Sequence, residues 1–259
     1  MKALPVVILF VCFNLVFSQS DSQYIENLFQ NHKGAFVLFD MTNGKYFRYN
    51  EKRCAERFLP ASTFKIPNSL IGLETGVILD ENFIIKWDGK ERGIQEWNRD
   101  HNLASAIKFS VVPYYQELAR RVGREKEQEY VNLFNYGNMK IGYRIDMFWL
   151  DNSLKISADE QIEFMRKFYN YKLPVSKRSI DIVKNILPKE EFSKSVVKAK
   201  TGGAQKEDGT SIGWLVGYVE NEKGVYLFAF NVDGNSFDEI RKLRDTVPKE
   251  ILKYLKVIE

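Results

Sequence analysis

The order of β-rich and helical segments along the chain is the feature that most restricts its fold. Two β-rich runs lie near the start, at 34–40 and 45–49, and Thr42, Asn43 and Gly44 between them are a hairpin signal. The β pattern returns late in the chain, at 195–200, 213–219 and 225–232. Strands near both ends of one chain predict a single antiparallel sheet that is assembled from both ends.

The segments outside these runs mostly show the 3.6-residue period of helices. Helical patterns cover 21–32, 61–76, 104–121, 125–134, 158–169 and 240–255. Most of them lie between the early and the late strands. We therefore expect an α+β fold in which helices flank the sheet and a helical subdomain is inserted over roughly 77–187.

The first eighteen residues differ in character from the rest of the chain. Lys2 is followed by an almost wholly apolar run at 4–17, and Val16 and Ser18 occupy the −3 and −1 positions of a cleavage site. This pattern is typical of a secretory signal peptide. We expect 1–18 to be that signal and 19–259 to form a single exported domain, because no later segment is long and apolar enough to span a bilayer.

Charge and histidine content exclude several classes of function. The net charge is only +4, from 38 basic and 34 acidic residues, and the two signs alternate without a long basic run. We therefore expect no nucleic-acid partner. His32 and His101 are the two histidines, so the chain has few ligands for zinc and little support for a Ser-His-Asp triad. We expect no metal.

A serine and a lysine three residues apart, Ser62-Thr-Phe-Lys65, are the first candidate catalytic pair. The same spacing occurs at Ser105 with Lys108 and at Ser195 with Lys198, so the spacing alone has little value. Ser195 lies in a predicted strand, where residues three apart point to opposite faces, and Ser105 lies inside a helical tract. Ser62 lies at a helix N-terminus, where free N–H groups favour negative charge and Lys65 faces the same side.

Lys65 is a useful base only if its environment favours the neutral amine. The pKa of a free lysine is about 10.4, and burial among apolar groups lowers it by about 3–5 units. We expect Phe64, Val112 and Trp149 to line such a pocket. With that environment, Lys65 is the candidate base that takes the hydroxyl proton of Ser62.

Lys200-Thr-Gly202 follows at the end of a predicted strand, with Gly203 next. On an edge strand this segment presents a cation and a hydroxyl to a substrate carboxylate. The backbone N–H of Gly203 is positioned to form an oxyanion hole with that of Ser62. Ser110-Val-Val112 supplies a further polar group.

Four motifs in this order resemble those of one known family, the class D (oxacillinase-type) serine β-lactamases. They are Ser62-Thr-Phe-Lys65, Ser110-Val-Val112, Tyr136-Gly-Asn138 and Lys200-Thr-Gly202, and Lys86-Trp-Asp-Gly89 and Phe148-Trp-Leu150 are also similar to family segments. The resemblance runs from about residue 34 to the last helix. It implies a β-lactamase/transpeptidase-like fold and hydrolysis of penicillins and oxacillin-type compounds through an acyl-enzyme.

The resemblance also implies roles for individual residues. Lys65 matches the family lysine that reacts with CO2 to carry a carboxylate, which serves as the general base of acylation and deacylation. No other cofactor is implied. Trp149 matches the tryptophan that hydrogen-bonds this carboxylate, and Ser110 matches the serine that relays protons.

Other matched residues concern the substrate and the site wall. Lys200, Thr201 and Arg244 match the residues that bind the β-lactam and its carboxylate. Gly203 and Val112 border the same site, and we interpret Tyr136 and Asn138 as its structural wall. The family and the signal imply a Gram-negative periplasm, antibiotic resistance and either a monomer or a homodimer.

Two related classes of protein remain as alternatives. A penicillin-binding protein, acting as a transpeptidase or carboxypeptidase, shares the serine–lysine pair and the Lys-Thr-Gly segment. Its second motif more usually has Asn at the position of Val112. A β-lactam sensor domain stays acylated, but it normally hangs from membrane helices.

Overall fold

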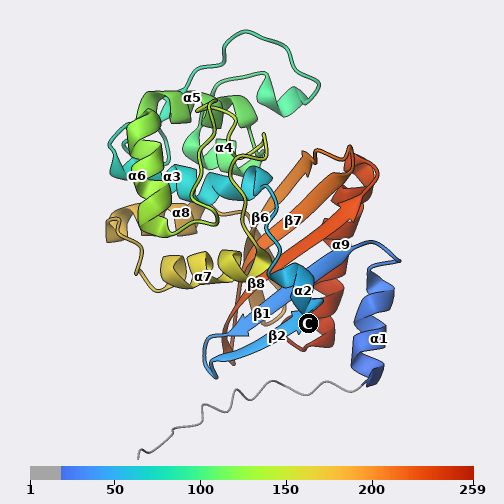
Figure 1. Cartoon of the computed structure of the whole chain (residues 1–259). Coiled ribbons are helices and arrows are strands. Elements are labelled where there is room, and N and C mark those ends of the chain that lie inside the picture. The colour runs from blue at the N-terminus through green and yellow to red at the C-terminus, as the bar shows by residue number, and fades with distance from the viewer. Residues whose placement is uncertain (1–18) are drawn as a thin grey trace, which may run out of the picture.

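The computed structural model describes residues 19–259, so the expected signal peptide at 1–18 lies outside the described residues. The described residues form a six-stranded antiparallel sheet in the order β2-β1-β8-β7-β6-β5. Strands from the two ends of the chain lie side by side in it, blue beside red in Figure 1. The strands are β1 (Gly34–Asp40), β2 (Lys45–Tyr49), β5 (Lys189–Phe192), β6 (Ser195–Gln205), β7 (Ser211–Asn221) and β8 (Gly224–Gly234). The expected α+β sheet built from both chain ends is confirmed.

The pairing of β1 with β8 joins the two halves of the sheet. Phe36 lies opposite Phe230 and Leu38 opposite Phe228, and all four side chains are buried. Because side chains alternate between faces, these residues form one apolar surface that a helix layer must cover. The C-terminal helix α9 (Phe237–Tyr254) covers it, with α1 (Gln19–Leu28) beside it.

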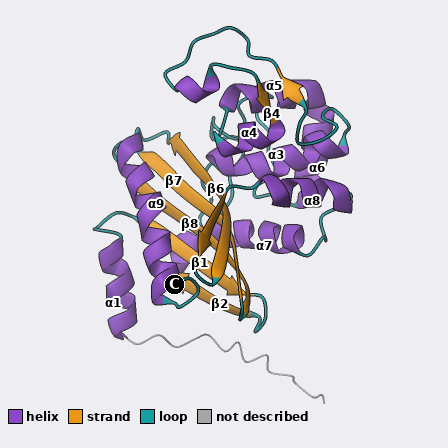
Figure 2. Ribbon diagram, turned by 180° about the vertical axis from the view of Figure 1, so that it is seen from behind, coloured by secondary structure: helices purple, strands orange, loops and turns teal. Residues whose placement is uncertain are grey.

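The other face of the sheet carries the helical part of the fold, as the view from behind shows (Figure 2). Helix α7 (Ala158–Tyr169) packs on β1 and β8, and α3 (Lys65–Glu74) contacts α5, α6 and α8. The remaining elements are α2 (Glu51–Cys54), η1 (Ala61–Phe64), β3 (Ile84–Ile85), η2 (Gln95–Trp97), β4 (His101–Asn102), α4 (Leu103–Lys108), α5 (Val112–Val122), α6 (Arg124–Phe134) and α8 (Lys177–Ile186). Helix α3 is buried along nearly all of its length, so it is the central helix of this part.

Two predicted elements differ from the structure in ways that concern the site. The helix expected at 104–121 is two helices, α4 and α5, because Ser110 adopts a left-handed backbone with φ 55° between them. The strand expected at 195–200 continues to Gln205 through pairing with β7. The Lys200-Thr-Gly segment therefore lies inside a strand and not at its end.

Candidate active site

Ser62 lies where a short 3-10 turn leads into the central helix. The turn η1 covers Ala61–Phe64 and α3 begins at Lys65, so Ser62 lies in the first turn of a continuous helical tract that starts at Ala61, as the sequence suggested. Ala61 adopts φ 48°, and its N–H donates to the carbonyl of Trp149 at 3.1 Å. Such a left-handed alanine costs on the order of 1–3 kcal/mol, so the surrounding contacts fix the position of Ser62.

The amine of Lys65 lies directly beside the hydroxyl of Ser62. Its Nζ donates to Ser62 Oγ at 2.8 Å. Lys65 is 1% exposed, and Ser62 is 8% exposed. A serine and a lysine three residues apart meet here because the tight turn places them on one side of the chain.

The surroundings of Lys65 favour its neutral amine. Burial lowers the pKa of Lys65 well below its ordinary value, and the nearby positive charge of Lys200 lowers it further. Desolvation acts in this direction because it penalises the charged form. The amine is therefore available to accept a proton or to react as a nucleophile.

Aromatic rings make most of this pocket. Phe64 stacks on Trp149 with ring centroids 5.8 Å apart, and Phe148 meets both rings edge-on. The ring of Tyr115 lies 5.1 Å from Lys65 Nζ, and its hydroxyl hydrogen-bonds Ser69 Oγ at 2.9 Å.

Tyr115 is a pocket residue that the sequence interpretation missed. Val112, which that interpretation put in the pocket, is half-buried at the first residue of α5. Tyr115 lies three residues further on, so it shares a helix face with Val112. The helical pattern of 112–122 is the sequence signal that identifies Tyr115 as a pocket residue.

Trp149 brings an unused hydrogen-bond donor to the pocket. Its side chain is fully buried, and its indole Nε1 has no hydrogen-bond partner within residues 19–259. An unpaired buried donor is costly, on the order of 1–3 kcal/mol. This N–H therefore marks a place where an acceptor group fits.

Ser110 and Lys200 form a second polar pair. Lys200 Nζ donates to Ser110 Oγ at 3.1 Å and to the carbonyl of Thr201 at 3.0 Å. Burial lowers the pKa of Lys200 to about 7, with a further contribution from the charge of Arg244. Ser110 and Lys200, which are 90 positions apart in the sequence, are thus joined by a hydrogen bond along which a proton can pass.

The strand β6 exposes backbone groups along its edge at this point. β5 pairs only with Ser195–Lys198 of that strand, and the Ala199 N–H donates toward the same side, to the carbonyl of Pro188 at 3.0 Å. Because strand geometry repeats every two residues, the N–H groups of Thr201 and Gly203 also point to this edge.

The turn η1 lies close against β6. A Cβ atom at Gly202 would stand 3.1 Å from the carbonyl oxygen of Pro60 and 3.2 Å from Thr63 Cγ2. Glycine at 202 therefore allows the strand to approach the turn that carries Ser62.

Arg244 reaches the same strand from helix α9. Its Nη1 donates to the carbonyl of Gly202 at 2.6 Å, and a Cβ at Gly203 would lie 2.9 Å from that nitrogen. Arg244 Nε is buried and makes no hydrogen bond in the described part of the chain, although it lies 3.7 Å from Asp245 Oδ1 in an ion pair. The guanidinium is thus held beside Thr201 and Gly203 with donor capacity left over.

Tyr136 and Asn138 lie in the wall behind the pocket. Tyr136 is fully buried and meets Phe64 edge-on at 5.5 Å. The side chain of Asn138 donates to the carbonyl of Ser153 at 2.8 Å and accepts from the Lys155 N–H at 3.0 Å. These contacts tie the loop before α7 to the segment that follows α6.

Neither histidine contributes to this group of residues. His32 pairs with Glu239 at 2.8 Å, and the buried His101 contacts Ser105 Oγ at 2.9 Å. Ser105 is part of the capping box of α4, in the first turn and not deep inside a helix as the sequence suggested.

Over 19–259 no cluster of three His, Cys, Asp or Glu side chains is arranged to hold a metal ion. In the same range no helix has the length and apolar character needed to cross a membrane.

Most of the described chain is similar to known proteins. Residues 18–255 match the Transpeptidase family, described as the penicillin binding protein transpeptidase domain. Beta-lactamase OXA-48 of Klebsiella pneumoniae is 47% identical over 232 residues, which are 89% of this chain and 87% of that protein.

Structural similarity agrees with the sequence matches. The crystal structure of FUS-1 (OXA-85), a class D beta-lactamase from Fusobacterium nucleatum subsp. polymorphum, has a TM-score of 0.87 and 39% identity. It covers 92% of this chain and 99% of its own. The Regulatory protein BlaR1 of Bacillus licheniformis is 36% identical over 78% of this chain, but the match spans only 33% of that protein.

Proposed function

The chain belongs to the class D β-lactamases, serine hydrolases that open the β-lactam ring, and we propose how its side chains carry out that reaction. Ser62 is the acylating nucleophile and Lys65 the group that moves its proton. The observation that carries this assignment is the 2.8 Å contact between Lys65 Nζ and Ser62 Oγ in a buried aromatic pocket.

The pocket also fits a carboxylate on Lys65, formed from CO2 or bicarbonate. CO2 adds only to a neutral amine, and burial favours the neutral form of Lys65. The unpaired Nε1 of Trp149 is the donor that such a group needs in an otherwise apolar pocket. When present, this carboxylate would supply the general base at the end of the Lys65 side chain.

Acylation begins when Ser62 Oγ attacks the lactam carbonyl carbon and its proton passes to the Lys65 side chain. The C–N bond of the ring then breaks. The leaving nitrogen takes a proton from Ser110, which Lys200 resupplies across their 3.1 Å contact. The pKa of Lys200 near 7 suits it to donate a proton and to regain it near neutral pH.

Backbone and cationic groups hold the substrate during these steps. The N–H groups of Ser62 and Gly203 stabilise the developing oxyanion. Thr201 and Arg244 bind the substrate carboxylate, and the spare donor capacity of Arg244 supports this role. Val112 borders the substrate, while Tyr136 and Asn138 keep the pocket wall in place.

Deacylation uses the same groups. Before this step the Lys65 side chain gives up the proton that it took from Ser62, and Lys200 regains the proton that it supplied to the lactam nitrogen. Water then attacks the ester carbonyl as its proton passes to the Lys65 side chain, and the bond to Ser62 Oγ breaks. Ser62 recovers its proton, and the penicilloic acid leaves. Hydrolysis of this kind gives resistance to the cell that makes the enzyme.

We further propose export to a Gram-negative periplasm. The support is the sequence of 1–18, with Lys2 before an apolar run. The enzyme works there as a monomer or as a homodimer.

Steady-state hydrolysis of benzylpenicillin and oxacillin, with and without bicarbonate, tests this mechanism. We expect rapid turnover that bicarbonate increases. Trp149→Phe keeps a ring against Phe64 but removes Nε1. It should raise the bicarbonate concentration needed for half-activation by about tenfold, the usual effect of losing a hydrogen bond to a charged group. A single stoichiometric burst, as a sensor or penicillin-binding protein gives, would contradict the proposal.

A further inference from the structure

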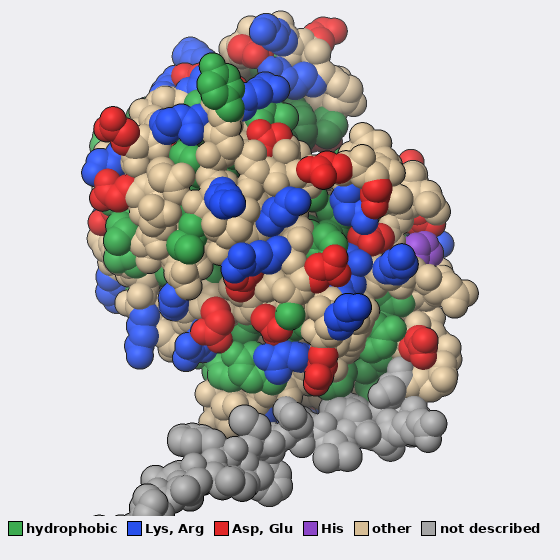
Figure 3. Space-filling view, viewed as in Figure 1, with side chains coloured by type: hydrophobic (Ala, Val, Ile, Leu, Met, Phe, Trp, Pro, Cys, Tyr) green, Lys and Arg blue, Asp and Glu red, His purple; other side chains and the backbone are tan. Residues whose placement is uncertain are grey.

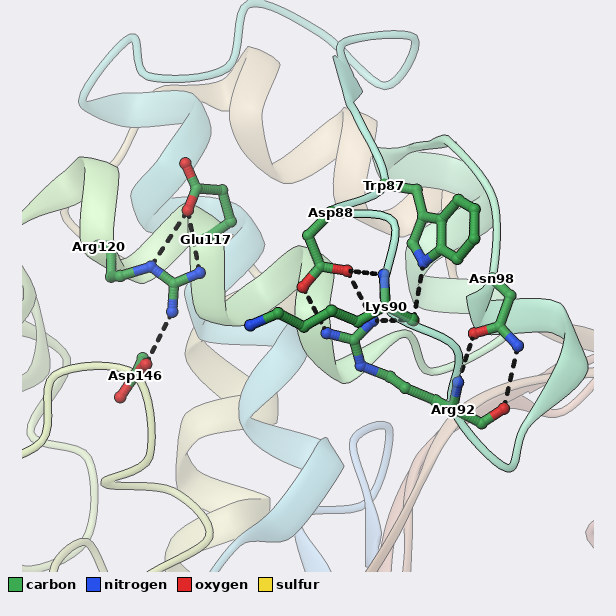
Figure 4. A network of polar contacts seen from close by, with 8 residues as sticks. All are labelled: Trp87, Asp88, Lys90, Arg92, Asn98, Glu117, Arg120 and Asp146. Atoms are coloured by element: carbon green, nitrogen blue, oxygen red, sulfur yellow. Dashed lines mark hydrogen bonds and ion pairs between the residues drawn. The ribbon is translucent and has the colours of Figure 1, made fainter.

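A cavity of about 590 Å³ lies in the helical part of the fold, between α5 and the loop that joins β3 to β4. Ser62, Lys65, Ser110, Lys200 and Arg244 are not among the residues that line it. Its size is that of a typical small-molecule site. Figure 4 shows the polar side chains that face it from the loop and from α5.

Hydrogen bonds hold the loop side of the cavity in a fixed shape. The backbone N–H of Trp87 donates to Asp100 Oδ1 at 2.9 Å, and the indole N–H donates to the carbonyl of Lys90 at 3.0 Å. Arg92 and Asn98 exchange two further hydrogen bonds of 2.9 and 3.0 Å. The cavity is therefore built before any ligand arrives, which lowers the entropy cost of binding.

Positive charge dominates the lining. Seven Lys and Arg side chains face the cavity, against the three carboxylates of Asp88, Glu117 and Asp146. Lys and Arg also gather over this upper part of the molecule in the space-filling view (Figure 3). A concave site with one prevailing sign of charge concentrates counter-ions.

The three carboxylates are already engaged. Both carboxylate oxygens of Asp88 accept hydrogen bonds from the Arg92 guanidinium, at 2.8 and 2.7 Å. Arg120 pairs with Glu117 at 3.0 Å and with Asp146 at 2.7 Å (Figure 4). The excess of positive charge therefore comes from other side chains that line the cavity.

Lys90 and Arg99 carry that surplus. Within residues 19–259, neither Lys90 Nζ nor the Arg99 guanidinium forms an ion pair of 4 Å or less with a carboxylate. Figure 4 shows Lys90 extending from its loop toward Arg120. Arg99 lies over the ring of Phe109, 5.2 Å from its centroid.

We propose that this cavity is a second ligand site, which binds a small, multiply charged anion of the phosphate-ester or pyrophosphate class. Lys90 and Arg99 supply its unpaired cations, and Arg92 and Arg120, already fixed by their carboxylates, supply further N–H donors. Planar guanidinium groups match phosphate oxygens, and two or more charges on the ligand balance the surplus. The site adjoins the turn of Ser110, because Val111 and Pro113 line it.

Calorimetric titration of the protein with inorganic pyrophosphate tests the proposal. We expect one saturable site per chain, weakened by about tenfold or more in Lys90→Gln and in Arg99→Gln. Lys52→Gln is the matched control, because Lys52 is exposed on α2 and its substitution removes the same charge. It should bind as the wild type does. Normal hydrolysis of benzylpenicillin by all three variants shows that they fold.

Three results would overturn the proposal. The first is the absence of saturable binding by the wild type. The second is equal weakening in Lys52→Gln, which would mean a general charge effect. The third is wild-type affinity in Lys90→Gln and Arg99→Gln with loss of binding in Arg244→Ala, which would place the anion in the active site.

Discussion

Lys65 Nζ lies 2.8 Å from Ser62 Oγ, and both atoms belong to residues that are almost completely buried. Two other serines in this chain precede a lysine by three residues, but they lack this contact. Ser105 is the third residue of helix α4 and part of its capping box, and the buried Ser195 Oγ has no hydrogen-bond partner in the described range. Position in the fold therefore separates the proposed nucleophile from the two other serines that have the same spacing to a lysine.

Replacing Ser62 by alanine should abolish covalent labelling by a fluorescent penicillin. The substitution removes the only atom that we propose to attack the lactam. Ser195→Ala is the matched control, since it deletes an unpaired hydroxyl from another serine with the same spacing. The control should label at the wild-type rate. Labelling of Ser62→Ala would refute the nucleophile assignment.

Activity should fall as the pH is lowered from neutral, and added bicarbonate should restore it in part. Burial lowers the pKa of Lys65, so its amine is neutral above that pKa and becomes protonated as the pH falls through it. A protonated amine does not take up CO2. Initial rates of benzylpenicillin hydrolysis over a range of pH and bicarbonate concentrations check this. Lys65→Ala should show no such rescue. A wild-type rate at low pH that is the same with and without bicarbonate would contradict the prediction.

Replacing Arg244 by alanine should raise KM for benzylpenicillin by about ten- to a hundredfold, with a smaller effect on kcat. Arg244 Nη1 is fixed on the Gly202 carbonyl at 2.6 Å, beside the strand that we propose receives the substrate carboxylate. Arg241→Ala is the control, because Arg241 lies on the same helix but is 62% exposed. A normal KM in Arg244→Ala, or an equal increase in Arg241→Ala, would show that Arg244 does not bind the carboxylate.

Local sequence rules predict some parts of this site well. The contact between Ser62 and Lys65 depends on a spacing of three residues within one helical turn, which the sequence contains. The β-rich runs at 34–40 and 225–232 likewise predict strands, and β1 and β8 form there with continuous buried stretches. In both cases the feature is decided by residues close together in the sequence.

Other parts depend on contacts that no local pattern contains. Ser110 meets Lys200 across 90 residues, so the resemblance to a family was needed to pair them. The break between α4 and α5 was missed, although Pro113 in the first turn of α5 is a helix-start signal. Gly202 and Gly203 lowered the β signal of 201–205, yet pairing with β7 keeps this segment in the strand.

Replacing Glu127 by methionine should stabilise the protein at neutral pH. Glu127 is fully buried on α6, and neither carboxylate oxygen has a hydrogen-bond partner in the described part of the chain. Burial raises its pKa from 4.5 to about 8. The folded state therefore holds a proton that the unfolded state releases between these values, so stability falls as the pH rises from about 4.5 to about 8. At pH 7 this amounts to about 3 kcal/mol.

Methionine has a similar length and no charge to desolvate, so it should remove most of this pH dependence. Urea unfolding of both proteins at pH 5, 7 and 8 measures the effect, and the gain should grow with pH up to about 8. Glu129→Met is the matched control on the same helix, where Glu129 is exposed and pairs with Lys126 at 2.7 Å. It should leave the pH dependence unchanged. If Glu127→Met is less stable than the wild type at pH 8, then the carboxylate has a stabilising partner and the argument from its burial fails.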